Sequence, residues 1–119
     1  MIRLEVRRVI VFTTNFAGMC DFYRDVIGLE IREEEDGWAD FDAGPIRLAI
    51  HAGRGGGSGG DDAGPHKVTF FAADVEAVRA ELIARGAKMG KLIRFDDTVI
   101  CDGHDPDGNR FQVSNRGPL

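Results

Sequence analysis

The sequence predicts an α+β fold made of two βαβββ modules arranged about a shared cleft. Three observations lead to this prediction. The same order of strand and helix patterns occurs twice along the chain. Each helix pattern follows a capping residue and ends at a glycine. Seven of the 16 glycines lie between residues 52 and 65, and this segment separates the two patterns into halves of similar size.

The composition argues against several classes of protein. A chain of 119 residues can form one domain with its own core, and 43% hydrophobic with 29% charged residues is ordinary for a globular protein. The net charge of −5 argues against nucleic-acid binding, which favours a basic surplus. No apolar run approaches the about 18 residues of a membrane span, and the N-terminal residues lack a signal-peptide core. With two cysteines and no CxxC spacing, we expect a cytoplasmic protein.

The first module is predicted from residues 1–51. A run rich in β-branched residues, Leu4–Thr13, indicates a strand. Asn15 can cap a helix, and apolar residues then recur at helical spacing up to Gly28, which suits the left-handed position after a helix. Turn signals separate three further strands. These strands are Leu29–Glu35, Trp38–Asp42 and Ile46–His51.

The second module, residues 66–115, repeats this order. Lys67–Ala72 is the predicted strand, Asp74 the next helix cap and Gly86 the end of that helix. Three strands follow, and a turn that begins at Asp105 precedes the last one. These strands are Lys88–Arg94, Thr98–Asp102 and Arg110–Asn115.

The segment between the modules, residues 52–65, is predicted to be a flexible Gly-rich linker. It lacks the Gly-Lys-Ser/Thr ending of a phosphate-binding loop. When the two modules are aligned at their helix caps, Arg8 is equivalent to Lys67. When they are aligned at the turns before their last strands, Arg47 is equivalent to Gln112. Matching positions in two modules suggest a pseudo-two-fold arrangement.

Strand alternation predicts which side chains face away from the helices. That open face combines polar and aromatic groups, as a small-molecule pocket requires. The predicted ligand-binding residues are Arg8, Phe12, Trp38, Arg47, Lys67, Phe71 and Gln112. An alternative is that the cations only pair with carboxylates, and a hairpin through Ala43-Gly44 would place Asp40 opposite Arg47 as one such pair. For Arg8 and Lys67, the repetition of a cation in both modules favours a function.

Two segments carry a family resemblance. Residues 21–29 (DFYRDVIGL) and 105–112 (DPDGNRFQ), together with the order of elements, resemble the vicinal oxygen chelate superfamily. This superfamily includes glyoxalases, bleomycin-resistance proteins and extradiol dioxygenases. The resemblance covers nearly the whole chain, and it implies one domain over residues 1–119 whose two modules curl into a cup-shaped, mostly antiparallel sheet.

The same resemblance argues against the metal site of the superfamily. The four positions at which metal-dependent members place His, Gln or Glu ligands hold Arg8, Arg47, Lys67 and Gln112 here. Cations cannot ligate a divalent metal, so we expect no metal and no cofactor. The three histidines have no HxH or HExxH spacing, and Cys20 and Cys101 are expected to be small buried residues without a catalytic role.

These points predict a metal-free protein that binds a small organic molecule, anionic or aromatic, in the cup, by sequestration or as a sensor. The alternative is a glyoxalase-, lyase- or dioxygenase-type enzyme with atypical metal ligands, so enzymatic activity and catalytic residues stay unassigned. A structural dimer module is a third hypothesis. We expect a homodimer, with the modules paired within a chain or exchanged between chains, and no nucleic-acid or membrane partner.

Overall fold

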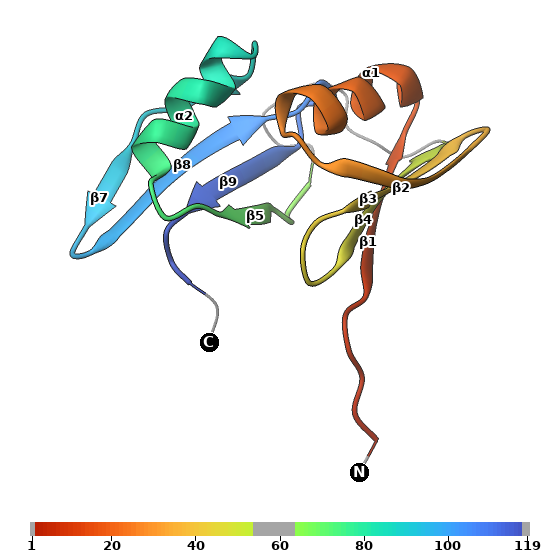
Figure 1. Cartoon of the computed structure of the whole chain (residues 1–119), viewed down its shortest axis with the longest axis horizontal. Helices are drawn as coiled ribbons and strands as arrows, with labels where there is room; N and C mark the ends of the chain where they lie inside the picture. The colour runs from red at the N-terminus through yellow and green to blue at the C-terminus, as the bar shows by residue number, and fades with distance from the viewer. Residues whose placement is uncertain (1, 54–63, 118–119) are drawn as a thin grey trace. The chain divides into compact units, whose positions relative to one another are not determined.

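A computed structural model describes residues 2–53 and 64–117 and confirms the α+β class (Figure 1). The chain divides into two compact units, Met1–Gly56 and Gly57–Leu119, each with a mixed sheet and one helical segment. Most of the predicted linker, residues 54–63, lies outside the described residues. Among the described helices, none is long and apolar enough to cross a membrane.

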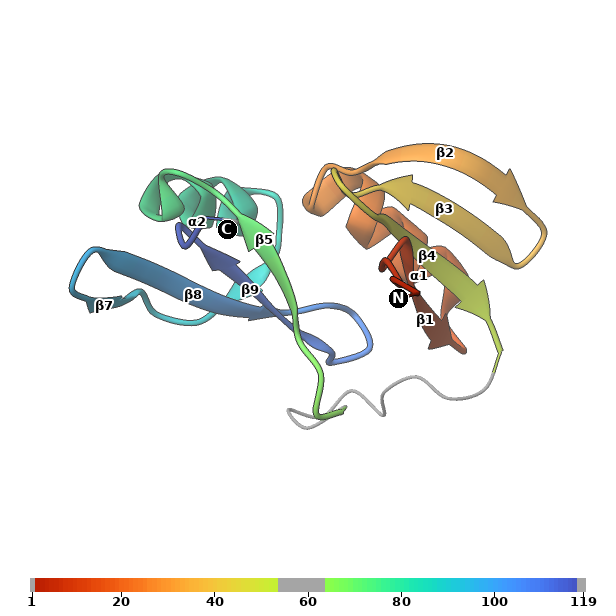
Figure 2. The same cartoon turned by 90° about the horizontal axis from the view of Figure 1, so that it is seen from below.

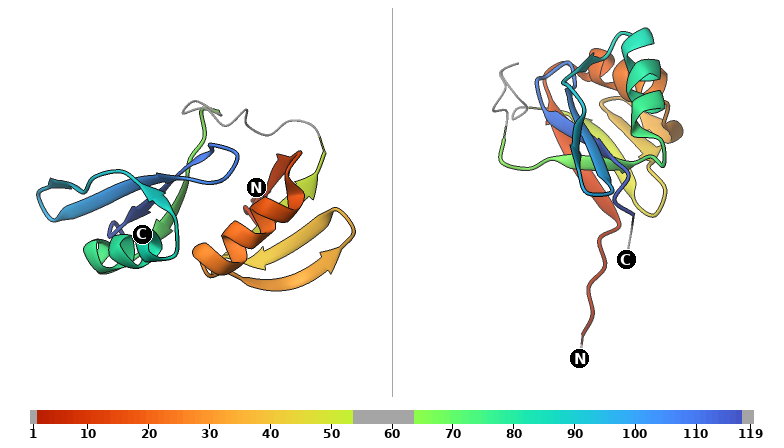
Figure 3. Two further views of the ribbon diagram at one scale, coloured as in Figure 1. Left: turned by 90° about the horizontal axis from the view of Figure 1, so that it is seen from above. Right: turned by 90° about the vertical axis from the view of Figure 1, so that its left-hand side faces the viewer.

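The first unit contains four strands and one helical segment. Its sheet has the order β1-β4-β3-β2, with β1 and β4 parallel and the other neighbours antiparallel (Figure 2). The helical segment lies across one face of this sheet (Figure 3). The elements are β1 (Arg8–Thr13), α1 (Phe16–Asp21), η1 (Phe22–Val26), β2 (Glu30–Glu35), β3 (Trp38–Asp42) and β4 (Arg47–Ala52).

The first helix begins and ends where the sequence predicts, but it changes type midway. The side chain of Asn15 accepts a hydrogen bond from the Gly18 N–H at 3.3 Å, and Gly28 ends the segment with φ of 90°. From Phe22 onward the turns widen into a π-helix, in which the Ile27 N–H bonds the carbonyl oxygen of Phe22.

The predicted first strand is too long at its N-terminal end. Residues 2–7 alternate apolar and charged side chains, yet they lie outside the sheet and extend beyond β1 (Figure 1). Only the carbonyl oxygen of Arg7 is held by the neighbouring strand, at 2.8 Å from the Arg47 N–H. Alternation indicates an extended conformation, whereas a strand in a sheet also needs a neighbour along its whole length.

The register of the β3–β4 hairpin also differs from the prediction. Asp40 stands opposite Ala49, because the loop spans the four residues 43–46 and not Ala43-Gly44 alone. The Asp42 carboxylate accepts a hydrogen bond from the Gly44 N–H at 2.9 Å, and Gly44 has φ of 92°. The shift is two residues, so every side chain keeps its predicted face.

The second unit repeats the arrangement with one more strand. Its sheet has the order β5-β9-β8-β6, in which β5 and β9 are parallel, and β7 also pairs with β8. Asp74 caps the helix through the Ala77 N–H at 3.0 Å. The single strand predicted over residues 88–94 is two short strands. The elements are β5 (Val68–Phe71), α2 (Val75–Ala84), β6 (Lys88–Met89), β7 (Ile93–Phe95), β8 (Thr98–His104) and β9 (Arg110–Ser114).

Each unit buries its own apolar layer between the helical segment and the sheet. In the first unit Met19, Phe41 and Ile50 are fully buried, and in the second Phe111 and Val113 are 1% and 2% exposed. The opposite face of each sheet has no helix of its own unit over it. That open face carries the polar and aromatic side chains described below.

Candidate functional site

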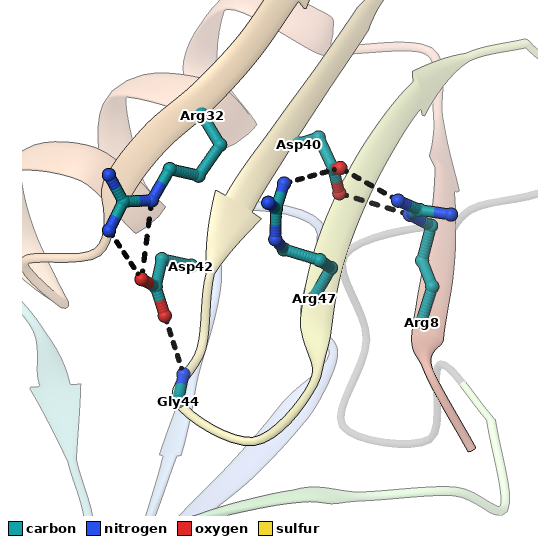
Figure 4. Close-up of polar contacts among 6 residues, drawn as sticks. All are labelled: Arg8, Arg32, Asp40, Asp42, Gly44 and Arg47. Atoms are coloured by element: carbon teal, nitrogen blue, oxygen red, sulfur yellow. Dashed lines mark hydrogen bonds and ion pairs between the residues drawn. The ribbon is translucent and has the colours of Figure 1, made fainter. Parts of the chain in front are cut away.

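The open face of the first unit holds a buried carboxylate between two arginines. Asp40 is fully buried, and it accepts hydrogen bonds from Arg8 Nε at 3.1 Å and Arg8 Nη2 at 2.9 Å (Figure 4). Arg47 Nη1 reaches the same carboxylate at 2.9 Å. The two arginine side chains are 40% and 37% exposed.

This arrangement fixes the charges of the cluster. The hydrogen bond from Arg8 is the largest effect that lowers the pKa of Asp40, and the charge of Arg47 adds to it. The same bond raises the pKa of Arg8. Asp40 is therefore ionised at neutral pH, and its carboxylate neutralises one of the two guanidinium charges.

Three aromatic rings lie beside this cluster. The guanidinium carbon of Arg8 is 5.8 Å from the centroid of the Trp38 ring. The ring of His51 lies 5.6 Å from that of Trp38 and 5.3 Å from that of Phe12, which is 45% exposed. The structure thus brings Arg8, Phe12, Trp38 and Arg47 together on one face. His51 was not among the predicted site residues, although its strand parity matches that of Arg47.

The second unit has a matching polar cluster around Asp102. Lys67 Nζ lies 3.2 and 3.1 Å from the two carboxylate oxygens, and Gln112 Nε2 donates to Oδ1 at 3.1 Å. Asp102 stands opposite Gln112 in the β8–β9 ladder, as Asp40 stands opposite Ala49 in the β3–β4 ladder. Each module therefore supplies a carboxylate from the strand next to the last to balance the cation at its first strand.

The predicted equivalence of Arg47 and Gln112 is wrong. Arg8 pairs with Arg47 across β1 and β4, whereas Gln112 pairs with Thr69, two residues after Lys67. Gln112 therefore corresponds to Ala49. The predicted equivalence matches Asp42 with Asp107, but Asp42 is the last residue of β3, whereas Asp107 lies three residues beyond the end of β8.

A pocket of about 330 Å³ opens on this face of the second unit. Gln112 is the one predicted site residue that lines it. Phe71 is 59% exposed but lies outside the lining. The pocket is lined by Thr69, Phe95, Ile100, Gln112, Ser114, Arg116 and Gly117. Sequence reasoning missed Phe95 and Arg116, because neither lies in the motifs that carry the family resemblance.

The described residues offer little to a metal ion. They contain no group of three or more His, Cys, Asp or Glu side chains placed to bind one. Asp40 and Asp102 are already bound to cationic side chains. Both cysteines are free and buried, and burial raises the pKa of Cys20 to about 11 and also raises that of Cys101. The expectation that both are small buried residues is confirmed.

Comparison with known families identifies the fold. The model of the Glyoxalase/Bleomycin resistance protein/Dioxygenase superfamily matches residues 5–113. The chain belongs to this superfamily. The resemblance deduced from residues 21–29 and 105–112 is therefore confirmed. No curated protein sequence matches the chain significantly.

Solved structures support the same fold at low sequence identity. A glyoxalase/bleomycin resistance protein/dioxygenase from Nocardioides has a TM-score of 0.79 and 15% identity, over 100% of this chain and 91% of its own. A lactoylglutathione lyase from Agrobacterium tumefaciens has a TM-score of 0.75 and 21% identity, over 95% and 94%. An antibiotic binding protein from Streptomyces sp. CB03234 has a TM-score of 0.74 and 19% identity, over 95% and 96%.

Proposed function

We propose that this protein is a metal-free member of the superfamily that binds a small organic molecule, aromatic or anionic, and acts by sequestration or as a sensor. The observation that carries the proposal is the pair of polar clusters on the open sheet faces. Arg8, Arg47 and Lys67 are cationic side chains, which do not ligate a metal, and carboxylates of the chain itself neutralise them. Such a site binds through rings and hydrogen bonds and does not need a metal.

The ligand contacts follow from these faces. Trp38 and Phe12 offer aromatic surfaces for stacking in the first unit, and Phe71 is exposed in the second. Arg8 and Arg47 share one carboxylate, so their cluster retains one positive charge that an anionic group can balance. A resemblance to an antibiotic binding protein agrees with sequestration. The free cysteines agree with a cytoplasmic location.

Elemental analysis and thermal denaturation test this proposal together. We expect the purified protein to carry no stoichiometric zinc, nickel, iron or manganese. We also expect at least one compound of an aromatic and anionic panel to raise the melting temperature. Trp38→Ala should reduce that rise, whereas Ile83→Ala, a change on the exposed side of α2, should leave it unchanged.

Two outcomes would count against the proposal. About one metal per chain, lost on Gln112→Ala, would favour the alternative of an enzyme with atypical ligands. A melting temperature that no compound of the panel raises would favour a structural module.

We further propose a homodimer, and the support lies in residues 2–7. The apolar members of this segment are Ile2, Leu4 and Val6, which are 88%, 90% and 68% exposed. An extended segment with one apolar side gains stability when it pairs with another strand. A second copy of the same segment is the proposed partner.

The charges of this segment agree with self-pairing. Two copies paired antiparallel about Leu4 place Arg3 opposite the partner's Glu5 and Ile2 opposite the partner's Val6. Opposite charges and apolar pairs then meet on separate sides of the two-stranded ribbon.

A further inference from the structure

The pocket of the second unit has one polar group whose direction is determined by its neighbours. Asp102 is an acceptor when ionised, so Gln112 must turn its NH₂ group toward it, and the contact is 3.1 Å. The carbonyl oxygen of the Gln112 amide is not used by Asp102 and can accept a hydrogen bond from a ligand. A ligand with a donor, such as a hydroxyl group, can therefore bond Gln112.

The lining also includes an arginine, Arg116, that forms no ion pair with the described residues. Arg116 is four residues after Gln112, and both residues line the pocket together with Ser114 between them. The Arg116 N–H donates to Ser114 Oγ at 3.0 Å, which holds the chain after β9 against the strand end. No ion pair among residues 2–53 and 64–117 includes Arg116.

This separates Arg116 from the cations that the sequence singled out. Arg8, Arg47 and Lys67 each already bond a carboxylate of the chain, so fewer of their donors are left for an anionic ligand. Arg116 can bind an anion without losing such a contact. Its fork of donors matches a carboxylate.

The remaining walls are suited to a flat ring. Phe95 is 44% exposed, and it lines the pocket with the half-buried Ile100. The volume of about 330 Å³ lies at the lower end of ligand pockets, which span about 300–1,000 Å³. A molecule of one or two rings fits such a space. Aromatic and aliphatic walls favour an aromatic ring.

We infer that this pocket binds a hydroxyaromatic carboxylate. Arg116 holds the carboxylate, the hydroxyl group donates to the Gln112 carbonyl oxygen, and the ring packs against Phe95 and Ile100. Gln112 and Arg116 both line the pocket and lie four residues apart along the chain, so we place the two polar groups of the ligand at opposite ends of its ring. The inference rests on the proposed function, since it names the ligand class of a small-molecule binding protein.

Calorimetry with three related probes tests the inference. 4-Hydroxybenzoate carries both groups, benzoate lacks the hydroxyl group, and 4-hydroxybenzamide lacks the charge. We expect the affinity of the wild-type protein for 4-hydroxybenzoate to be at least about tenfold higher than for either of the other two probes. Each lost polar contact costs roughly 1.4 kcal/mol or more.

Variants assign the two ends of the ligand. Arg116→Gln should lower the affinity for 4-hydroxybenzoate about tenfold and leave the affinity for 4-hydroxybenzamide unchanged. Gln112→Leu should lower the affinity for 4-hydroxybenzoate and leave the affinity for benzoate unchanged. Arg110→Gln is the matched control, because Arg110 is an exposed arginine of β9 outside the pocket, and it should bind all three probes as the wild type does.

The outcomes distinguish this inference from the proposed function. Equal binding of all three probes, or an Arg116→Gln variant with unchanged affinity for 4-hydroxybenzoate, overturns the inference and leaves the proposed function in place. The same holds if none of the three probes binds while another compound of the aromatic and anionic panel raises the melting temperature. If neither the probes nor the panel bind, both fail.

Discussion

Asp40 is the residue on which the open face of the first unit depends. Its carboxylate is fully buried and accepts three hydrogen bonds from two arginines that stand on neighbouring strands. Two guanidinium groups at such close range would repel each other without it. A buried carboxylate with one partner would also be costly, so the three side chains are stable only as a set.

Asp40→Asn should lower the free energy of unfolding at pH 7 by about 3 kcal/mol, the low end for a broken buried ion pair, because both arginines are partly exposed. The pKa of Asp40 is lowered in the folded state, so its contribution is complete above the unfolded value of about 3.9 and is lost as pH falls through the lowered pKa. Chemical denaturation across this pH range measures the difference between variant and wild type, which should vanish in strong acid.

Asp42→Asn is the matched control for Asp40→Asn. Arg32 also lowers the pKa of Asp42, but the Asp42 side chain is 35% exposed, so we expect a loss of about 1 kcal/mol or less. Equal losses in both variants at every pH would contradict the role assigned to Asp40.

The two thiols give a second prediction about single residues. Because burial raises the pKa of Cys20 to about 11 and also raises that of Cys101, both are protonated at neutral pH. We expect neither to react with a disulfide reagent on the time scale on which the denatured chain reacts fully. Rapid labelling of one thiol in the native protein would show that it is accessible and reactive.

Strand β8 leaves no room for a side chain at Gly103. Gly103 is buried between β6 and β9, and a Cβ atom there would lie 2.5 Å from Met89 Sδ and 2.6 Å from Phe111 Cζ. Met89 can move, but Phe111 is 1% exposed and belongs to the core. The absence of a side chain at this position allows β6 and the Phe111 ring to approach β8.

Gly103→Ala should therefore lower the free energy of unfolding by about 1–3 kcal/mol through overpacking. Gly64→Ala is the control, because a Cβ at Gly64 meets no atom of residues 2–53 and 64–117 within 4 Å. Urea denaturation of both variants checks the prediction. An unchanged unfolding midpoint for Gly103→Ala would mean that Phe111 and Met89 can repack at no cost.

At the scale of the whole molecule, the proposed homodimer depends on residues 2–7. Leu4→Lys places a charge at the centre of the proposed two-stranded contact and should shift the protein from dimer to monomer. Ile83→Lys is the control, since Ile83 is an exposed apolar residue of α2 outside that contact. Sedimentation at roughly tens of micromolar measures both. A wild-type monomer, or a Leu4→Lys variant that stays dimeric, would contradict the proposal.

Local signals predicted the elements well because each depends on a few neighbouring residues. The caps Asn15 and Asp74, the glycines Gly28 and Gly86, and the faces of β1, β4, β5 and β9 are as predicted. The family also follows from two short motifs, and its model matches residues 5–113. Side chains of a strand alternate with a period of two. The predicted β3–β4 register is wrong by two residues, and Asp40 and Arg47 therefore still lie on one face.

The sequence alone thus determined the α+β class, the two modules and the open face of each sheet. The cup in which the modules were predicted to meet stays a prediction. Only the tertiary structure decided that carboxylates already hold Arg8, Arg47 and Lys67, and that Arg116 lines a pocket with Gln112. The physical reason is that a charge pair depends on distances between strands, which loop lengths and ladder registers set, and neither is encoded in the local pattern of one strand.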